Sequence, residues 1–152
     1  MSIKNQVDRL NSAMALLIMM MQEVDDTCVR LSETISKKEL VIISFVGDQG
    51  KVIMKDIANY AQIPVSTTTG LIDKLVKKGH LKRVFSETNW RSIFIELDKE
   101  GQEVYQLMNN MRNEMSNRII DDLSSEESNT FIHLLEKITS NLHKYTPKVE
   151  KV

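Results

Sequence analysis

The sequence predicts a mostly α-helical protein with one small β-hairpin, arranged as a winged helix-turn-helix between long terminal helices. Three observations indicate this fold class. The first segment repeats apolar residues at helical spacing, and the middle segment places a short helix, a tight turn, a second helix and two alternating runs in order. Only five glycines and two prolines interrupt the 152 residues, a length that corresponds to a single domain.

Residues 1–34 are predicted to form one long helix used for dimerisation. Their apolar positions recur every 3.5 residues, as in helices packed along their length: Ile3, Val7, Leu10, Met14, Leu17, Met21, Val24, Cys28 and Leu31. One small chain cannot surround a helix of roughly 28 residues on all its apolar sides, so we expect a second copy to cover it. The apolar run at 13–21 is too short to cross a bilayer, and nothing resembles a signal peptide. The lone Cys28 rules out an internal disulfide framework, so a cytoplasmic protein is expected.

The middle segment, residues 36–98, carries the predicted winged helix-turn-helix. Ser36 and Glu39 have the spacing of a capping box, which begins a helix that Gly47 is expected to end. A short strand is predicted at 51–54, a short helix at 55–61, a turn at 62–64 and a second helix at 65–79. The runs 80–86 and 91–97 alternate as the two strands of a hairpin do.

Residues 99–152 complete the domain with two further dimerisation helices. Asp98 precedes the first of them, and Ser124 with Glu127 forms a second capping box that begins the other. Pro147 is expected to end this last helix. The whole chain, 1–152, is thus one domain in which terminal helices enclose the winged motif.

The second helix of the motif begins with residue types that are poor helix formers. Within "VSTTTGLIDKLVKKG" (65–79), the residues predicted to face the core are Thr68, Leu71, Ile72 and Leu75. The residues left outside are Ser66, Thr67, Thr69, Gly70, Asp73, Lys74 and Lys77. Such a helix enters the DNA major groove by its N-terminal end, where small hydroxyls can reach base edges and lysines can reach phosphates. The simpler interpretation is that the hydroxyls cap the helix and the lysines are only solvated.

Charge is distributed unevenly along the chain. The net charge is −1, which by itself indicates no polyanionic partner. Residues 66–91, however, carry six cations against two anions and are therefore +4. This local excess, together with the order of the elements, favours binding of double-stranded DNA over the simpler interpretation.

From "SKKELVIISFV" through "MKDIANYAQIPVSTTTGLIDKLVKKGHLKR" to "RSIFIELDKEGQEVY", the chain resembles the multiple-antibiotic-resistance regulator (MarR) family of dimeric bacterial transcription factors. The resemblance implies that Ser66, Thr67, Thr69 and Gly70 read bases and that Lys74 and Lys77 face phosphates. Arg91 matches the second arginine of the family's Asp-Arg-Arg triplet in the wing.

The wing departs from that triplet. Its Asp is Asn89 and its first Arg is Trp90, so the usual salt bridge of the wing is absent, and Gly70 replaces a frequent Arg. Asn89 and Arg91 are still predicted to contact DNA, whereas Trp90 can either stack on a sugar or pack on the hairpin.

No catalytic set, cofactor motif or metal-ligand spacing is evident, because the three histidines are dispersed, so an enzyme is not expected. Cys28 falls on the apolar stripe and can be a buried hydrophobe or, as in some family members, an oxidant sensor; nearby aspartates favour the first. Small aromatic or lipophilic effectors of the family bind between the dimerisation helices and the winged domain. Met21, Phe45 and Met108 are candidate lining residues, although simple core packing is the preferred interpretation of them.

The sequence therefore predicts a homodimeric, sequence-specific DNA-binding regulator, expected to be a repressor of a pseudo-palindromic operator that an effector relieves. The alternative is a winged-helix dimer that binds a protein partner, with weak or no specific DNA binding.

Overall fold

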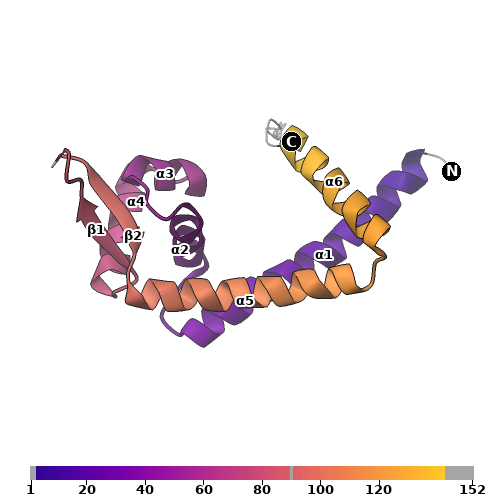
Figure 1. Cartoon of the computed structure of the whole chain (residues 1–152), viewed down its shortest axis with the longest axis horizontal. Helices are drawn as coiled ribbons and strands as arrows, with labels where there is room; N and C mark the ends of the chain where they lie inside the picture. The colour runs from indigo at the N-terminus through magenta and orange to yellow at the C-terminus, as the bar shows by residue number, and fades with distance from the viewer. Residues whose placement is uncertain (1–2, 90, 143–152) are drawn as a thin grey trace, which may run out of the picture. The chain divides into compact units, whose positions relative to one another are not determined.

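The computed structural model describes residues 3–89 and 91–142, which contain six helices and one antiparallel hairpin (Figure 1). This confirms the predicted fold class. The chain divides into two compact units, residues 1–112 and 113–152, and each is described by itself. The first unit holds the winged motif and therefore the candidate site.

The first helix, α1 (Ile3–Ser32), is continuous, as its apolar period predicts. Cys28 is its one fully buried residue, whereas large apolar side chains along the helix stay exposed within the chain. These are Ile3, Val7, Leu10, Met14, Leu16, Ile18, Met19, Met20, Met21 and Leu31. The protomer thus leaves most of this apolar surface uncovered.

Helix α2 (Lys37–Gln49) begins with the predicted capping box. The Ser36 side chain accepts a hydrogen bond from the Glu39 N–H, and the Glu39 carboxylate accepts one from the Ser36 N–H at 2.8 Å. The prediction that Gly47 ends this helix is wrong, because the helix continues to Gly50, whose φ is 78°. A Cβ at Gly47 would lie 2.3 Å from the Tyr105 ring, so this glycine permits close helix packing instead.

Helices α3 (Met54–Ala61) and α4 (Val65–Lys77) form the helix-turn-helix, with Gln62 in the left-handed region at the turn. The predicted strand at 51–54 is wrong: Val52 alone pairs, as an isolated bridge with Ile95, and α3 already begins at Met54. The ladder stops there because the Asp56 carboxylate accepts the Ile53 N–H and begins the helix.

The hairpin consists of β1 (Leu81–Phe85) and β2 (Ile93–Leu97), in antiparallel register with Leu81 opposite Leu97. One face of it completes the core of the first unit. That core is formed by buried residues from α1, α2, α3, α4, both strands and α5: Cys28, Leu40, Ile42, Ile43, Val46, Ile57, Ile72, Leu75, Leu81, Ile95, Leu97, Val104 and Met108.

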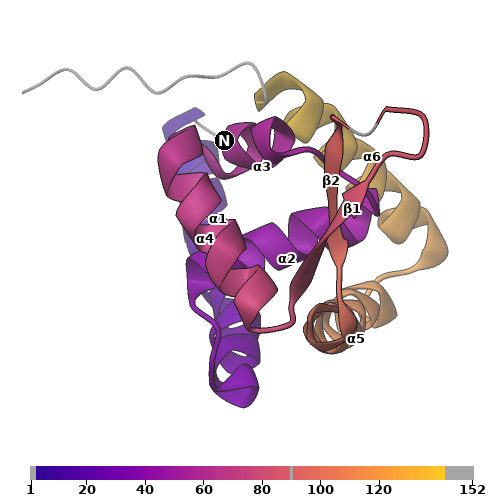
Figure 2. The ribbon, with the colours of Figure 1, turned by 90° about the vertical axis from the view of Figure 1, so that its left-hand side faces the viewer.

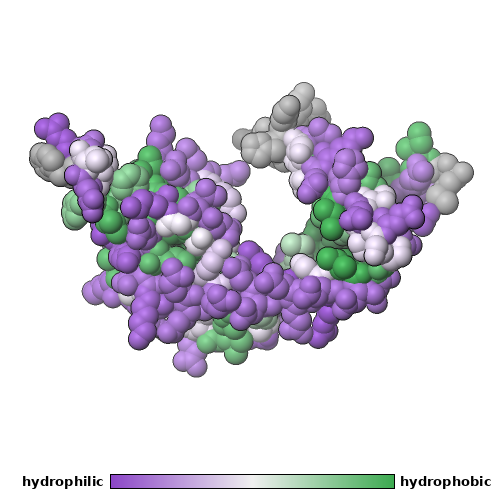
Figure 3. All heavy atoms as spheres, in the orientation of Figure 1, coloured by the Kyte–Doolittle hydropathy of each residue, from purple (hydrophilic) through white to green (hydrophobic). Residues whose placement is uncertain are grey.

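Helix α5 (Lys99–Asp121) leaves the hairpin, and α6 (Ser125–Leu142) follows it. The predicted capping box of α6 is confirmed by hydrogen bonds between Ser124 and Glu127 in both directions. Helix α6 exposes Phe131, Ile132, Leu134, Leu135, Ile138 and Leu142. Hydrophobic surface is visible at both terminal helices (Figure 3). Pro147 and His143 lie outside the described residues.

No helix in the described part of the chain is long and apolar enough to span a membrane.

Candidate nucleic-acid interface

Helix α4, which the sequence predicts to be the recognition helix, exposes the predicted side. Ser66, Thr67, Thr69 and Gly70 are all exposed, while Thr68, Ile72 and Leu75 are fully buried. The helix stands beside α3 and the hairpin on one side of the first unit (Figure 2). The N-terminal half of α4 therefore presents small polar side chains and bare backbone to solvent.

Two of the hydroxyls make local hydrogen bonds. The buried Thr68 hydroxyl donates to the Pro64 carbonyl at 3.0 Å, and the exposed Thr69 hydroxyl donates to the Val65 carbonyl at 2.9 Å. A hydroxyl that donates once keeps lone pairs that can accept a further bond. Thr68 is thus structural, whereas Thr69 can still accept from a donor group on a base.

Gly70 has open space around it. Apart from its two chain neighbours and the adjacent backbone of α4, a Cβ placed there would meet no described atom within 4 Å. Glycine costs about 1 kcal/mol relative to alanine inside a helix, and no packing within the protomer requires it here. An outside requirement, such as close approach of a DNA groove, would account for it.

The lysines of α4 differ in their surroundings. Lys74 Nζ lies 3.3 Å from a carboxylate oxygen of Glu39, and Lys78 Nζ lies 3.3 Å from the same oxygen. Lys77 is exposed. Glu39 is only 1% exposed, so one buried carboxylate both caps α2 and holds two lysines of the recognition segment. This anchor fixes α4 against α2.

The charge of Glu39 depends on these contacts. Burial raises the pKa of Glu39, but the hydrogen bonds from the Ser36 N–H, Lys74 and Lys78 outweigh it, and the net pKa lies below the ordinary value. A lowered carboxyl pKa stabilises the fold above the unfolded-state pKa, and this stabilisation is lost as pH falls through the folded-state pKa.

We expect Glu39→Gln to lower the free energy of unfolding by about 2 kcal/mol at pH 7, because it removes charge-assisted hydrogen bonds to a buried group. The difference from wild type should shrink as the pH falls through the lowered folded-state pKa of Glu39, because Glu39 itself then becomes protonated. Urea unfolding across this pH range measures both effects. Glu87→Gln, at an exposed position, is the matched control; equal stability of Glu39→Gln and this control at pH 7 would contradict the anchor.

The wing is tied to the recognition helix by an ion pair between Arg83 of β1 and Asp73 of α4. At its tip, the Asn89 side chain accepts the Arg91 N–H at 3.2 Å, and the Asn89 N–H donates to the Ser86 hydroxyl. Asn89 thus shapes the turn without the family's salt bridge. Asn89 and Arg91 are exposed beyond the strands, and Trp90 lies outside the described residues.

The three candidate effector residues differ in their surroundings. Met108 is fully buried in the core, Met21 is 50% exposed, and the Phe45 ring stacks on Tyr60 at a centroid distance of 4.3 Å. A cavity of about 330 Å³ lies next to them along the chain, between α1, α2 and α5. Its lining includes Gln22, Ser44, Asp48, Tyr60 and Arg112.

Cys28 is fully buried, with Sγ 3.5 Å from Sδ of Met111. Burial and the Asp25 carboxylate raise the pKa of the Cys28 thiol, against the opposing influence of Arg112. The thiolate that oxidants attack is therefore disfavoured. His80 is buried and His133 is exposed on α6; in the described chain, no three His, Cys, Asp or Glu side chains cluster as metal ligands.

Sequence reasoning missed three features of this region: the Glu39 anchor, the Arg83–Asp73 pair and the burial of His80. The capping box gave a signal for Glu39 as a helix start, but its lysine partners lie 35 and 39 positions further along the chain. No short-range sequence pattern predicts an ion pair between residues so far apart in the chain.

The winged region matches known proteins. Residues 34–92 match the sequence model of the MarR family. An HTH-type transcriptional regulator from Bacillus subtilis, YfiV, is 28% identical over 92 residues, which cover 60% of this chain and 58% of that protein. The match thus spans a little over half of the relative's length, and such relatives are named as regulators rather than enzymes.

Solved structures extend the likeness over nearly the whole chain. A MarR family protein from Bacillus stearothermophilus superposes with a TM-score of 0.76 at 19% identity, covering 95% of this chain and 100% of that one. Streptococcus pneumoniae FabT, solved in complex with DNA, gives a TM-score of 0.70 at 25% identity and covers 91% and 95% of the two chains.

Proposed function

Because this chain belongs to the MarR family of winged-helix transcriptional regulators, we propose that it is a homodimer that binds a pseudo-palindromic DNA operator and represses transcription until a small molecule relieves it. The observation that carries this proposal is the exposed face of α4. Small hydroxyls, a glycine in open space and Lys77 lie together there, and this combination suits a helix that enters the major groove.

Two exposed apolar helices support the homodimer. Helices α1 and α6 each leave a series of large apolar side chains 39% exposed or more. Burying such side chains stabilises by about 25 cal/mol per Å² of apolar surface, and a second copy offers the same surface in return. Two recognition helices would then lie about 34 Å apart, one turn of DNA.

The cavity beside Arg112 supports relief by an effector. Arg112 lies 3.5 Å from an Asp25 carboxylate oxygen and donates to the Ser44 hydroxyl at 3.3 Å. A ligand that competes for this arginine would act on the packing of α1, α2 and α5, and so on the spacing of the two recognition helices. Met21, Phe45 and Met108 remain predicted neighbours of that ligand.

Selection of duplexes from a random-sequence pool by the purified protein tests the proposal. We expect enrichment of an inverted repeat whose half-sites lie about 10 base pairs apart, at both low and moderate salt. Recovery of no repeat, with weak binding that salt abolishes, would contradict sequence-specific recognition and favour the protein-interaction module.

A matched pair of lysine variants checks the docking face. Lys77→Ala should weaken binding to the selected duplex and lower the slope of log affinity against log salt by about 1, because one phosphate contact is lost. Lys38→Ala, exposed on α2, should leave both unchanged. Identical salt slopes for the two variants would remove Lys77 from the interface.

A further inference from the structure

Lys78 follows α4 directly, and the backbone around it is fixed by a Schellman motif. The Gly79 N–H donates to the Val76 carbonyl at 3.1 Å. The His80 N–H donates to the Leu75 carbonyl at 2.9 Å, and Gly79 has the positive φ of 80° that this motif requires. The Lys78 side chain therefore leaves the C-terminal end of α4 from a well-defined position.

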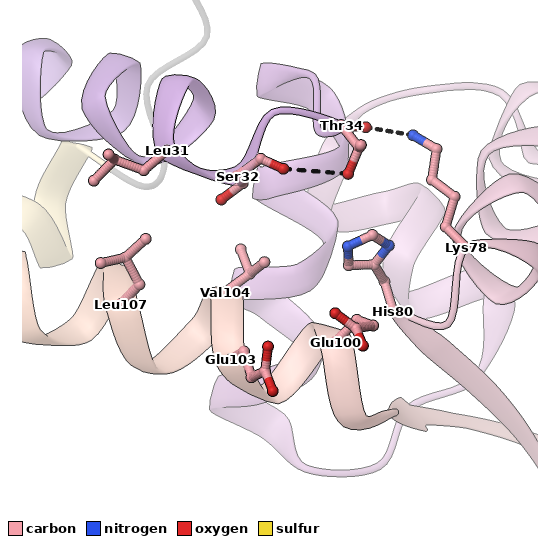
Figure 4. Close-up of a pocket in the computed structure, with 9 residues that line it drawn as sticks. All are labelled: Leu31, Ser32, Thr34, Lys78, His80, Glu100, Glu103, Val104 and Leu107. Carbon is pink, nitrogen blue, oxygen red and sulfur yellow. Dashed lines mark hydrogen bonds between the residues drawn. The ribbon is translucent and has the colours of Figure 1, made fainter.

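The Lys78 side chain reaches the turn that follows α1. Its ammonium donates to the Thr34 carbonyl (Figure 4) and to both carboxylate oxygens of Glu39, at 3.3 and 3.4 Å. A lysine ammonium has three donors, so these three acceptors occupy all of them. The side chain is only 26% exposed. One lysine thus joins the end of α4 both to the turn after α1 and to the start of α2.

The turn after α1 is shaped to present the Thr34 carbonyl. Glu33 lies in the left-handed region with a φ of 53°. The N–H and the hydroxyl of Thr34 both donate to the Ser32 carbonyl, while the Thr34 carbonyl accepts from Lys78 (Figure 4). Carbonyls at the C-terminal end of a helix carry partial negative charge and favour a cation, and the Lys78 ammonium lies at the C-terminal ends of both α1 and α4.

Lys74 shares the Glu39 carboxylate but makes a different connection. Its Nζ lies 3.3 Å from Oε1 of Glu39, and its side chain is 58% exposed. This ion pair joins the middle of α4 to α2, whereas the hydrogen bonds of Lys78 also include the turn after α1. Lys78 therefore connects the predicted recognition helix with the helix that carries the exposed apolar surface.

This connection matters for the proposed homodimer, in which the partner covers α1 while α4 enters the groove. The separation of the two recognition helices then depends on how each protomer holds α4 relative to α1. One base pair moves a half-site by about 3.4 Å along the DNA axis and by roughly a tenth of a turn around it. A small displacement of α4 from the end of α1 is therefore enough to change the preferred spacing.

We propose that Lys78 is a positioning residue that holds α4 at a fixed offset from the end of α1 and so limits the homodimer to one half-site spacing. This inference rests on the proposed function and deepens it, because it names a residue that sets the spacing. Lys78 acts here through the placement of α4 and not by touching DNA.

Duplexes in which the selected inverted repeat is lengthened or shortened by one base pair at its centre test the inference. By fluorescence anisotropy, we expect wild type to bind them about tenfold more weakly than the selected repeat, as for one mismatched base pair. Lys78→Met, which removes the ammonium but keeps an unbranched side chain, should bind all of these duplexes with nearly equal affinity. It leaves Glu39 with Lys74 and the Ser36 N–H, so the variant should fold.

Lys51→Met is the matched control. Glu96 is shared by Lys51 at 3.3 Å and Lys82 at 3.9 Å, so this variant also removes one of two lysines from a common carboxylate. The loss of a positive charge lowers affinity for every duplex alike and cancels in the ratio between spacings. Lys51→Met should therefore keep the spacing preference of wild type.

Spin labels attached at Ser66→Cys in both copies give a second readout without DNA. Ser66 is exposed on α4, whereas the native Cys28 is fully buried. Pulsed electron paramagnetic resonance should give a narrow distribution of the distance between the two labels in the otherwise wild-type protein and with Lys51→Met. The distribution should be broader with Lys78→Met.

The outcomes separate this inference from the proposed function. If wild type discriminates the spacings and Lys78→Met discriminates them equally, the role of Lys78 is overturned while operator recognition stands. Equally narrow distance distributions, or a spacing preference lost in Lys51→Met as well, would overturn it too. A wild-type protein that binds no repeat would refute the proposed function, and this inference with it.

Discussion

Replacing Gly101 with alanine is expected to destabilise the protein more than any other single methyl addition at a glycine. A Cβ at this position would lie 2.0 Å from the carbonyl oxygen of His80 and 2.9 Å from its carbon. Both are backbone atoms, so no side-chain rotation can relieve the contact. Helix α5 begins at Lys99, and its close approach to the backbone of His80, just before β1, therefore depends on a residue without a side chain.

The hydrogen bonds around His80 prevent an easy adjustment. Its carbonyl accepts the Asp98 N–H at 2.9 Å, and its own N–H donates to the Leu75 carbonyl at 2.9 Å. Moving the carbonyl by the ångström or so that a methyl group requires would stretch these bonds. Overpacking typically costs about 1–3 kcal/mol, and a lost hydrogen bond adds about 1 kcal/mol.

We therefore expect Gly101→Ala to lower the free energy of unfolding by about 3 kcal/mol, despite the better helix propensity of alanine. For a domain of this size, that corresponds to a fall of roughly 10 °C in Tm. Urea unfolding and thermal circular dichroism measure it. A variant as stable as wild type would show that α5 can move away from the hairpin at little cost.

The fold was predictable wherever local patterns carry the signal. The 3.5-residue period of apolar residues predicted α1, and the two capping boxes predicted where α2 and α6 begin. Hydroxyls that cap a helix and apolar residues at helical spacing act within one or two turns. Such short-range interactions can therefore be predicted from one amino-acid sequence.

Predictions failed where a distant residue decides the local structure. Glycine often ends a helix, but Gly47 lies inside α2, where the absence of a side chain leaves room for the Tyr105 ring of α5. Val52 lies within the strand predicted at 51–54, yet only its isolated bridge to Ile95 forms. The roles of these residues depend on partners that the order of the chain does not reveal.

The candidate interface shows the same division. The outward placement of Ser66, Thr67 and Thr69 follows from helical spacing, since Thr68 and Ile72 occupy the buried side. The pairing of Lys74 with Glu39 does not follow from spacing, and it assigns that lysine a role inside the protomer as well as a predicted one on DNA.

At Gly70, one substitution is expected to change the stability of the fold and the affinity for DNA in opposite directions. Apart from its two chain neighbours and the adjacent backbone of α4, the Cβ of an alanine at this exposed position would meet no described atom within 4 Å. Because alanine is favoured over glycine in a helix interior, we expect Gly70→Ala to raise the free energy of unfolding by about 1 kcal/mol. This stabilisation is the opposite of the effect expected at Gly101.

The same methyl group should weaken operator binding. If the backbone at Gly70 approaches the groove floor, a Cβ there must displace DNA or neighbouring side chains. Disturbing one base contact costs about 1–3 kcal/mol, so we expect about tenfold weaker affinity for the selected duplex, by fluorescence anisotropy, with an unchanged salt slope because no charge is removed.

Gln102→Ala, on the exposed side of α5, is the control for this pair of measurements. It changes helix propensity slightly and should leave DNA affinity unaltered. If Gly70→Ala is stabilised and still binds the duplex as tightly as wild type, residue 70 lies away from the groove, and glycine there is explained neither by packing nor by DNA. If it is stabilised and binds weakly, the helix accepts a less stable residue because the DNA surface requires it.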